Sequence, residues 1–238
     1  SNDSSFLTFN LSGSRDLITC SGSSTTDTAN LSANVSKGSN SLSFSGSSLF
    51  SAGDWIQLID NDTAKTTSTW ATGSSGQIVK ILSITGNSIQ VNTEIRRYYL
   101  LHDQPYIKRL NMVENNKIEN LSILRLDSTA GQTSNINFNY AHNSSVNCIK
   151  SYNCNFSHIE VNYSSNITLE GSYFQDSYGY GGGGRAYGIM LQFATGDCFV
   201  YNNKFNHLRH AMILQAGANG NVFAYNFSIN PFWTGTSL

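Results

Sequence analysis

Two strips of the C-terminal half of the sequence recur at nearly the same interval. Residues 189–192 (IMLQ) return as residues 212–215 (MILQ), and residues 199–202 (FVYN) return as residues 223–226 (FAYN). An interval of about 20–25 residues holds two or three short strands, and each copy buries its apolar side chains by stacking on the next. The repeat therefore predicts a solenoid.

Weaker copies precede these strips from about residue 118 onward. Equivalent positions are expected at Ile123, Phe156, Phe174, Phe205 and Ile229, which are unevenly spaced along the chain. Such unevenness is typical of strands of constant length joined by variable turns. Leucine-rich repeats share the period, but the regular leucine spacing that they need is missing. The pattern favours a parallel β-helix.

Asparagines punctuate the repeats. Asn120, Asn202 and Asn226 are expected at equivalent turn positions, where Asn adopts the left-handed conformation and hydrogen-bonds to the Asn above and below. This pattern resembles the asparagine ladder of pectate-lyase-like β-helix proteins. The resemblance implies a right-handed parallel β-helix, and by analogy a protein that binds or cleaves extended polysaccharides.

The N-terminal half, residues 1 to about 108, has the alternation of antiparallel β structure. Strands are predicted at residues 55–59, 77–84 and 89–91, the last two forming a hairpin, with a polar loop over residues 60–75. This succession resembles the small β-domain inserted near the start of many β-helix proteins, and it covers about residues 40–99. We expect an all-β chain whose β-helix rungs occupy residues 109–238.

The chain stops after a repeat, at residues 231–238, without an amphipathic helix or polar strand to cap the open end of the solenoid. Further rungs or a partner are therefore expected to cover this end. Residues 1–4 lack the apolar core of a signal peptide, and no run of about 18 apolar residues that would span a membrane is present. Abundant Asn and Ser with little Lys resemble bacterial extracellular proteins, which favours a secreted or cell-surface location.

Charge and cysteine content narrow the function further. With 14 basic and 15 acidic side chains, the chain has no basic stripe for nucleic acid. The four cysteines, Cys20, Cys148, Cys154 and Cys198, lack the paired spacing of a zinc site and are too few for a disulfide scaffold. We expect most to be buried hydrophobes or to form one incidental bridge, and we expect no metal or cofactor.

The candidate catalytic residues lie around a glycine-rich loop and between two rungs. The register of the repeat places Tyr187 beneath His210, and β-elimination of a uronate needs a cation, a base and an acid. Arg185 or Arg209 would neutralise the carboxylate, His207 or His210 would act as the base, and Tyr187 would donate the proton. Candidate substrate-binding residues share aromatic, cationic or amide side chains: Tyr178, Tyr180, Lys204, Gln192 and Gln215.

Other interpretations remain open. The segment 207–210 (HLRH) is equally consistent with an ordinary turn, and Gln192 and Gln215 with a stacked ladder. Hydrolysis would need two carboxyl groups, for which Asp176 and Asp197 are available. Neither residue has the Asp-Asp or Gly-His-Gly signature of polygalacturonase-like hydrolases, so that subfamily is disfavoured. The glycine-rich loop 178–185 lacks the lysine and helix of a phosphate loop. We expect a secreted carbohydrate-active protein that cleaves or binds an acidic polysaccharide, with lyase-type β-elimination as its reaction and a polysaccharide or cell-surface glycan as partner. The alternative is a non-enzymatic adhesin or structural β-helix that binds glycans or partners.

Overall fold

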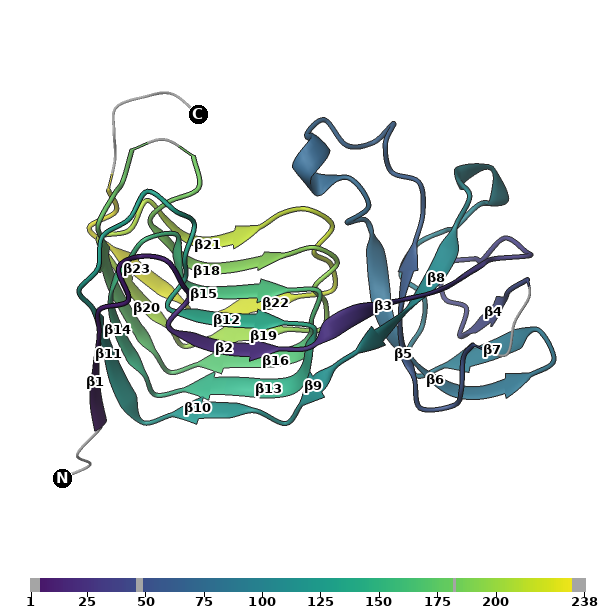
Figure 1. Cartoon of the computed structure of the whole chain (residues 1–238), viewed down its shortest axis with the longest axis horizontal. Coiled ribbons are helices and arrows are strands. Elements are labelled where there is room, and N and C mark those ends of the chain that lie inside the picture. Colours follow the sequence, from purple (N-terminus) through teal and green to yellow (C-terminus); the bar gives the residue numbers. More distant parts are fainter. Residues whose placement is uncertain (1–4, 46–48, 182, 233–238) are drawn as a thin grey trace.

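The computed structural model describes residues 5–45, 49–181 and 183–232. The sequence predictions for residues 1–4 and for residues 233–238 therefore lie outside the described residues. The chain forms a solenoid of stacked strands and, beside it, a smaller antiparallel domain (Figure 1). The prediction of an all-β parallel β-helix is confirmed.

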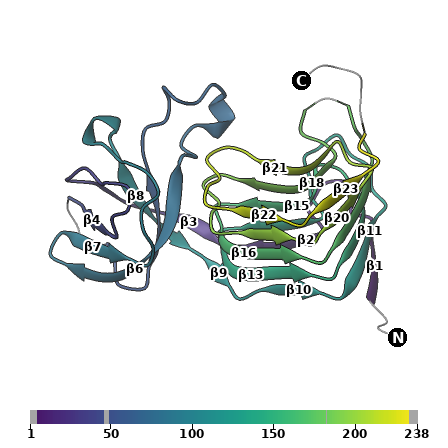
Figure 2. The ribbon, with the colours of Figure 1, turned by 180° about the vertical axis from the view of Figure 1, so that it is seen from behind.

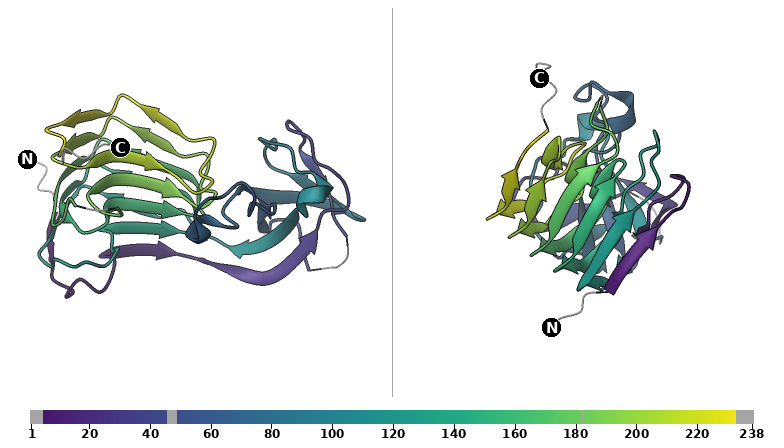
Figure 3. Two further views of the ribbon diagram at one scale, coloured as in Figure 1. Left: turned by 90° about the horizontal axis from the view of Figure 1, so that it is seen from above. Right: turned by 90° about the vertical axis from the view of Figure 1, so that its left-hand side faces the viewer.

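Three parallel sheets form the faces of the solenoid, and in each of them successive coils pair side by side. Sheet 1 contains β1 (Ser5–Phe9), β11 (Leu121–Arg125), β14 (Lys150–Cys154), β17 (Tyr173–Ser177), β20 (Lys204–Asn206) and β23 (Phe227–Ile229). Sheet 2 contains β10 (Lys117–Glu119), β13 (Ala141–Asn147), β16 (Ser165–Glu170), β19 (Phe199–Tyr201) and β22 (Val222–Ala224), with β9 (Val113–Glu114) paired to β13. Sheet 3 contains β2 (Ile18–Ser21), β12 (Ile136–Asn139), β15 (Ser157–Asn162), β18 (Tyr187–Gln192) and β21 (His210–Leu214). Figure 2 shows the stack from behind, and the right-hand view of Figure 3 looks onto a row of parallel strands running in colour from purple to yellow.

The antiparallel domain is inserted between sheets 3 and 2, because the chain leaves the solenoid after β2 and re-enters it at β9. Its sheet has the order β3 (Ser23–Asn30), β8 (Tyr106–Asn111), β5 (Trp55–Ile59), β6 (Gly76–Thr85), β7 (Ser88–Val91) and β4 (Ser41–Ser43). Two short 3-10 helices, η1 (Thr69–Ala71) and η2 (Leu101–Asp103), lie in its loops. The predicted hairpin of β6 and β7 is present. The first two strands differ from the antiparallel expectation: β1 and β2 pair in parallel with β11 and β12, since Ile18 and Cys20 pack against the solenoid core.

The predicted equivalence of repeat positions is correct in part. In sheet 1 the inward row is Ile123, Ser151, Phe174, Phe205 and Ser228. The placement of Phe156 in this row is wrong, because it lies in the turn between β14 and β15 and packs outside the solenoid. Ile229 is one residue out of register. The sequence misled here because Ser151 replaces the expected apolar residue; its hydroxyl binds the buried Asn135 and His158 side chains instead.

In each of the paired coils, the residue that follows the sheet 2 strand adopts the left-handed conformation. The residues with positive φ there are Asn120, Cys148, Gly171, Asn202 and Tyr225. The prediction for Asn226 is therefore one residue out of register. Asn226 instead stacks on Asn203, whose backbone N–H donates to the Asn226 Oδ1 at 3.1 Å. The ladder exists, but its asparagines occupy the residue after the left-handed position.

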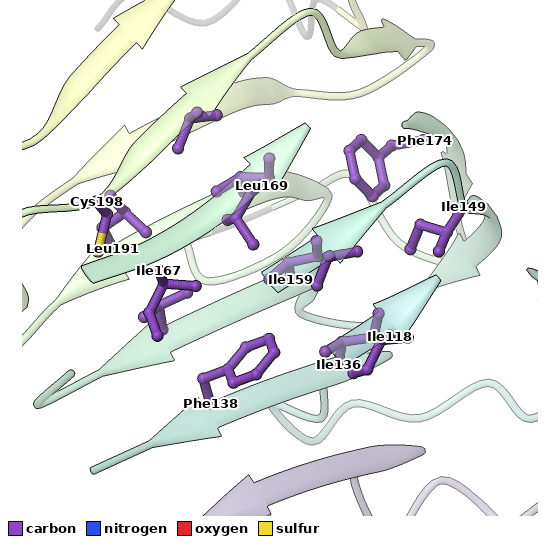
Figure 4. Packing of buried hydrophobic residues seen from close by; sticks show 14 of the residues in the cluster. Ile118, Ile136, Phe138, Ile149, Ile159, Ile167, Leu169, Phe174, Leu191 and Cys198 are labelled. Atoms are coloured by element: carbon purple, nitrogen blue, oxygen red, sulfur yellow. The ribbon is translucent and has the colours of Figure 1, made fainter. Parts of the chain in front are cut away.

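Apolar side chains from all three sheets fill the interior of the solenoid (Figure 4). Two cysteines behave as the expected buried hydrophobes, Cys154 and Cys198, while Cys148 is exposed. All four cysteines are free, so the alternative of one incidental bridge is not realised. No helix in the described part of the chain is long and apolar enough to cross a membrane.

Aromatic stacking and ion pairing fix the inserted domain against the solenoid. Tyr140, Tyr163 and Phe193 stack on successive coils at the corner between sheets 3 and 2, with ring centroids 4.9 and 5.1 Å apart. The Trp55 indole of the inserted domain donates a hydrogen bond to Glu114 at 2.6 Å. Arg96 forms an ion pair with Asp197 at the same corner. The inserted domain therefore packs directly against the solenoid at this corner.

Candidate functional site

A groove lies over the outer face of sheet 3, with a volume of about 670 Å³. One side is formed by the glycine-rich loop and the other by the inserted domain. The side chains that line it are mostly amides and aromatics: Trp70, Gln132, Phe156, Glu160, Gly183, Gly184, Tyr187, Gln192, Phe193 and Gln215. We call this the Glu160 groove.

The floor of the groove follows from strand alternation. In β15, Ile159 and Val161 point into the core, so Glu160 points outward. The same alternation places Gln192 and Gln215 side by side on the outer face of β18 and β21. The predicted register of these two glutamines is confirmed, because Gln215 Nε2 donates to Gln192 Oε1 at 2.6 Å. Gln192 Nε2 in turn donates to Glu160 Oε1 at 3.0 Å.

Glu160 is the buried carboxyl group of the groove, with 8% of its surface exposed. Burial raises the pKa of this carboxyl, and the negative charge of Asp16 acts in the same direction. Hydrogen bonds from Asn162, Ser134 and Gln192 oppose the shift without cancelling it. Burial therefore shifts the pKa of this carboxyl group in the direction that a general acid requires.

Asp16 is the second carboxylate beside Glu160, and one serine connects the two. The Ser134 backbone N–H donates to Asp16 Oδ1 at 2.6 Å, and the Ser134 hydroxyl donates to Glu160 Oε2 at 2.8 Å. Asn137 donates to the other oxygen of Asp16 at 2.7 Å. Two carboxyl groups in different environments are thus held next to each other on one face of the sheet.

Tyr187 lines the groove beside the glycine-rich loop, and His210 is its partner on the next coil. The predicted register is confirmed, because the two residues are cross-strand partners and their rings lie 5.5 Å apart. The Tyr187 hydroxyl accepts a hydrogen bond from the Gly184 N–H at 2.9 Å, and its ring packs on Phe156. Burial lowers the pKa of His210, with the charge of Arg209 acting in the same direction. Tyr187 therefore also holds the loop in place.

His207 lies at a different corner, where it contacts Asp176 and Tyr180. Its Nδ1 is 2.8 Å from Asp176 Oδ1 and 3.1 Å from the Tyr180 hydroxyl. Tyr180 stacks between the rings of His207 and Phe232, with centroids 4.8 and 4.3 Å away. These contacts anchor the start of the glycine-rich loop, and the structure does not bring His207 together with Tyr187 and His210 as one cluster.

The other predicted site residues are spread around the loop and sheet 1. The Tyr178 hydroxyl donates to the Arg125 carbonyl at 2.8 Å, and Arg185 donates to the Ala130 carbonyl at 2.8 Å, so both tie the loop to the solenoid. Lys204 lies in sheet 1, with its ammonium 5.9 Å from the Tyr173 ring. Arg209 lies in the turn before β21, where its N–H donates to the Ala186 carbonyl.

The alternative carboxyl pair does not assemble. Asp176 contacts His207 at the corner next to sheet 1. Asp197 forms its ion pair with Arg96 at the corner between sheets 3 and 2. The two carboxylates therefore belong to separate structural contacts on different corners.

Tailspikes of bacteriophages are similar in structure. The tailspike gp61 of Pseudomonas phage phi297 matches 93% of this chain and 37% of its own, with a TM-score of 0.71 and 14% identity. The tailspike gp49 of Pseudomonas phage LKA1 matches 93% of this chain and 42% of its own, with a TM-score of 0.67 and 14% identity. The chain has the parallel β-helix fold of these tailspikes.

A third tailspike, Gp54 of Acinetobacter baumannii bacteriophage AP22, was solved in complex with A. baumannii capsular saccharide. It matches 90% of this chain and 47% of its own, with a TM-score of 0.51 and 15% identity. The chain thus spans less than half the length of each of these tailspikes. No protein-family model and no curated protein matches it.

Glu160, Asp16 and Trp70 were not expected from the sequence. Glu160 stands in register with Met190, and a lone carboxyl among apolar neighbours in a strand was the available signal. Trp70 belongs to the inserted domain, far from Glu160 along the chain, and the sequence carries no sign that it meets the solenoid. Of the predicted site residues, Tyr187, Gln192 and Gln215 line the groove and His210 pairs with Tyr187. All four belong to the regular repeat.

Proposed function

We propose that the chain is a tailspike-type protein that binds a bacterial surface polysaccharide in the Glu160 groove and hydrolyses it there, with Glu160 as the proton donor. The observation that carries this proposal is the buried carboxyl group with a raised pKa inside a groove of amides and aromatic rings. Such a lining suits sugars, since amides bind hydroxyl groups and aromatic faces pack on pyranose rings. An extracellular or virion-surface location accords with this function.

Hydrolysis of a glycosidic bond needs a protonated carboxyl group to donate to the leaving oxygen, and a second carboxylate to activate water or to attack. Glu160 fits the first role because burial raises its pKa. Asp16 fits the second because two hydrogen bonds, from the Ser134 backbone N–H and the Asn137 amide, fix its carboxyl group beside Glu160. As the bond between the anomeric carbon and the glycosidic oxygen breaks, the Glu160 carboxyl gives its proton to that oxygen. A water molecule, whose proton passes to the second carboxylate, forms the new bond to the anomeric carbon.

β-Elimination is the second candidate, and the contact between Tyr187 and His210 favours it. In this scheme His210 would take the proton next to a uronate carboxyl and Tyr187 would donate to the leaving oxygen. A cation must also neutralise that carboxyl. The described residues that line the groove include no Lys or Arg, so we place hydrolysis first.

Glu160→Gln tests the proposal, with Glu170→Gln as the matched control. Glu170 also accepts an amide hydrogen bond, from Asn147 at 2.9 Å, but it lies in sheet 2 outside the groove. The chain is incubated with purified capsular polysaccharides and lipopolysaccharide O-chains, those of Acinetobacter and Pseudomonas included, and depolymerisation is followed by size-exclusion chromatography and reducing-end release. We expect Glu160→Gln to lower turnover about 10²–10⁴-fold while binding persists, and Glu170→Gln to act as the wild type.

Three outcomes separate the alternatives. Products that absorb in the ultraviolet as unsaturated uronates, with activity abolished in Tyr187→Phe and retained in Glu160→Gln, would establish β-elimination instead. Binding without any cleavage would establish the adhesin. Absence of both binding and cleavage across the panel would refute a carbohydrate function for the groove.

A further inference from the structure

A long loop of the inserted domain reaches toward the solenoid. Residues 60–75 connect β5 to β6 and carry the single turn η1. In Figure 1 this helix stands between the two parts of the molecule, and the left-hand view of Figure 3 shows it at the edge of the stacked coils. We call residues 60–75 the arm.

Buried charges hold the base of the arm. Asp62 is 1% exposed, and its two carboxylate oxygens accept the backbone N–H groups of Gly73 and Ser75 at 2.7 and 3.0 Å. Asp62 therefore clamps the two ends of the arm together. Lys65 adds ion pairs to Asp60 and Asp103 at 3.1 and 3.0 Å.

The end of the arm packs directly on the solenoid. A Cβ atom at Gly217 would lie 2.3 Å from the Ser74 carbonyl oxygen, so this approach requires glycine, which also has φ of +80° there. Asn219 of the same turn donates to the Gly76 carbonyl at 2.8 Å. The arm is thus fixed in position against the corner between β21 and β22.

Trp70 at the tip of the arm lines the Glu160 groove while keeping 57% of its surface exposed. The edge-to-face contact with Phe193, at a centroid distance of 6.0 Å and an angle of 82°, sets its orientation. Phe193 is the last ring of the stack that continues through Tyr163 to Tyr140. A large aromatic ring is therefore held rigidly over a groove and leaves most of its area free.

We infer that the arm forms a sugar-binding subsite in which Trp70 stacks on the apolar face of a neutral sugar residue, and that Asp62 is the residue that positions it. The inference rests on the proposed function and adds the recognition element. The sugar is assigned as neutral because the described residues that line the groove are mainly amides and aromatic rings with a single carboxyl group, Glu160, and no cation. Lys65, which lines the neighbouring hollow beside Trp70, is already paired with Asp60 and Asp103. An indole face binds such a ring through its hydrophobic and C–H contacts.

Trp70→Ala tests the subsite, with Tyr98→Ala as the matched control. Tyr98 is 63% exposed and belongs to the same domain, but it does not line the groove. For the polymer that the intact chain binds in the polysaccharide panel, we expect Trp70→Ala to raise Kd or KM about tenfold, the loss of one stacked ring, and to leave kcat within twofold. Trp70→Phe should restore most of the binding, and Tyr98→Ala should match the wild type.

Asp62→Asn tests whether Asp62 positions Trp70, because the asparagine amide keeps only one of the two oxygen acceptors that bind the Gly73 and Ser75 N–H groups. We expect it to raise KM in the same way as Trp70→Ala, and the double variant to be no weaker than Trp70→Ala alone, as two residues that act through one contact require. Additive losses in the double variant, with the thermal midpoint also falling, would show that Asp62 serves only folding.

The two proposals fail in different ways. If Trp70→Ala binds and cleaves as the wild type while Glu160→Gln abolishes cleavage, the subsite is wrong and the proposed function stands. If the polymer that binds owes its affinity to carboxylate groups, so that carboxyl reduction of the polymer removes binding, the neutral-sugar assignment is overturned. If no polymer of the panel binds the intact chain, the function and the subsite fall together.

Discussion

Strands β15 and β16 follow each other in one coil of the solenoid, yet their surroundings differ completely. In β16 buried and partly exposed residues alternate, as expected for a strand with one face on the core and one in solvent. In β15 every residue is buried, and the same holds for β18 above it. Over β15 and β18 the outer face of sheet 3 is covered by the glycine-rich loop and the arm, whereas the outer face of β16 in sheet 2 is not.

This difference locates the proposed site. Glu170 on the open face of β16 is partly exposed and remains in contact with solvent. Glu160 on the covered face of β15 is desolvated, which raises its pKa. A β-helix presents similar outer faces to solvent, so a functional site arises where other segments wall one of them off.

The largest expected effect is on stability, when a carboxylate is introduced on the covered outer face of sheet 3 and compared with one on the open outer face of sheet 2. Met190→Glu introduces a carboxylate at a fully buried outer position of sheet 3 whose strand partner is Glu160. We expect a loss of about 3–5 kcal/mol in the free energy of unfolding, because the new charge has no counterion. Phe199→Glu, on the outer face of sheet 2 and 49% exposed, should change it by about 0.5 kcal/mol or less. Equal losses in urea unfolding would remove the distinction between the faces.

A second test uses the inner side of β15. Burial lowers the pKa of His158 to about 3, compared with about 6.5 in an unfolded chain. The unfolded state therefore binds the proton first, so stability falls as the pH drops from about 6.5 toward about 3, by at most about 1.4 kcal/mol per pH unit for one group. We expect His158→Gln to flatten this part of the stability curve.

The control for His158 is His102→Gln, since the His102 side chain is 73% exposed. It should leave the pH dependence unchanged. Thermal midpoints measured between pH 4 and pH 8 compare the three proteins. A curve for His158→Gln that is as steep as the wild type would show that another group controls acid stability.

The regular repeat is the part of the structure that could be predicted from the sequence. The partners Tyr187 and His210, and Gln192 and Gln215, were predictable because the coil between them has constant length and side chains alternate along each strand. Phe156 was misplaced because a polar residue, Ser151, took the inward position that an apolar residue was expected to fill. The local sequence pattern thus predicts the stacked coils correctly only where every inward-facing residue is apolar.

The groove was not predictable for a different reason. Trp70 reaches it through the docking of the arm on Gly217, a contact between segments that lie far apart in the sequence. Tyr178 and Tyr180 of the glycine-rich loop were predicted to bind substrate; in the structure the Tyr178 hydroxyl bonds the Arg125 carbonyl and the Tyr180 ring stacks on Phe232. Both outcomes depend on tertiary packing, which the hydrophobic periodicity of the sequence does not reveal.

The smallest expected effect is on the pKa of Glu160 and comes from Gln192, whose side-chain amide joins β15 and β18 in the floor of the groove. A donor to a carboxylate stabilises its charged form and lowers its pKa, so Gln192→Ala should raise the pKa of Glu160 further. Because a general acid works in its protonated form, the rate falls as the pH rises through that pKa. We expect the alkaline limb of the pH–kcat profile to move to higher pH by less than about one unit. Gln175→Ala is the control, since Gln175 also donates to a carboxylate, Asp176, but on sheet 1. A limb that moves equally in both variants, or to lower pH in Gln192→Ala, would mean that the covered face of β15 does not set the acidity of Glu160.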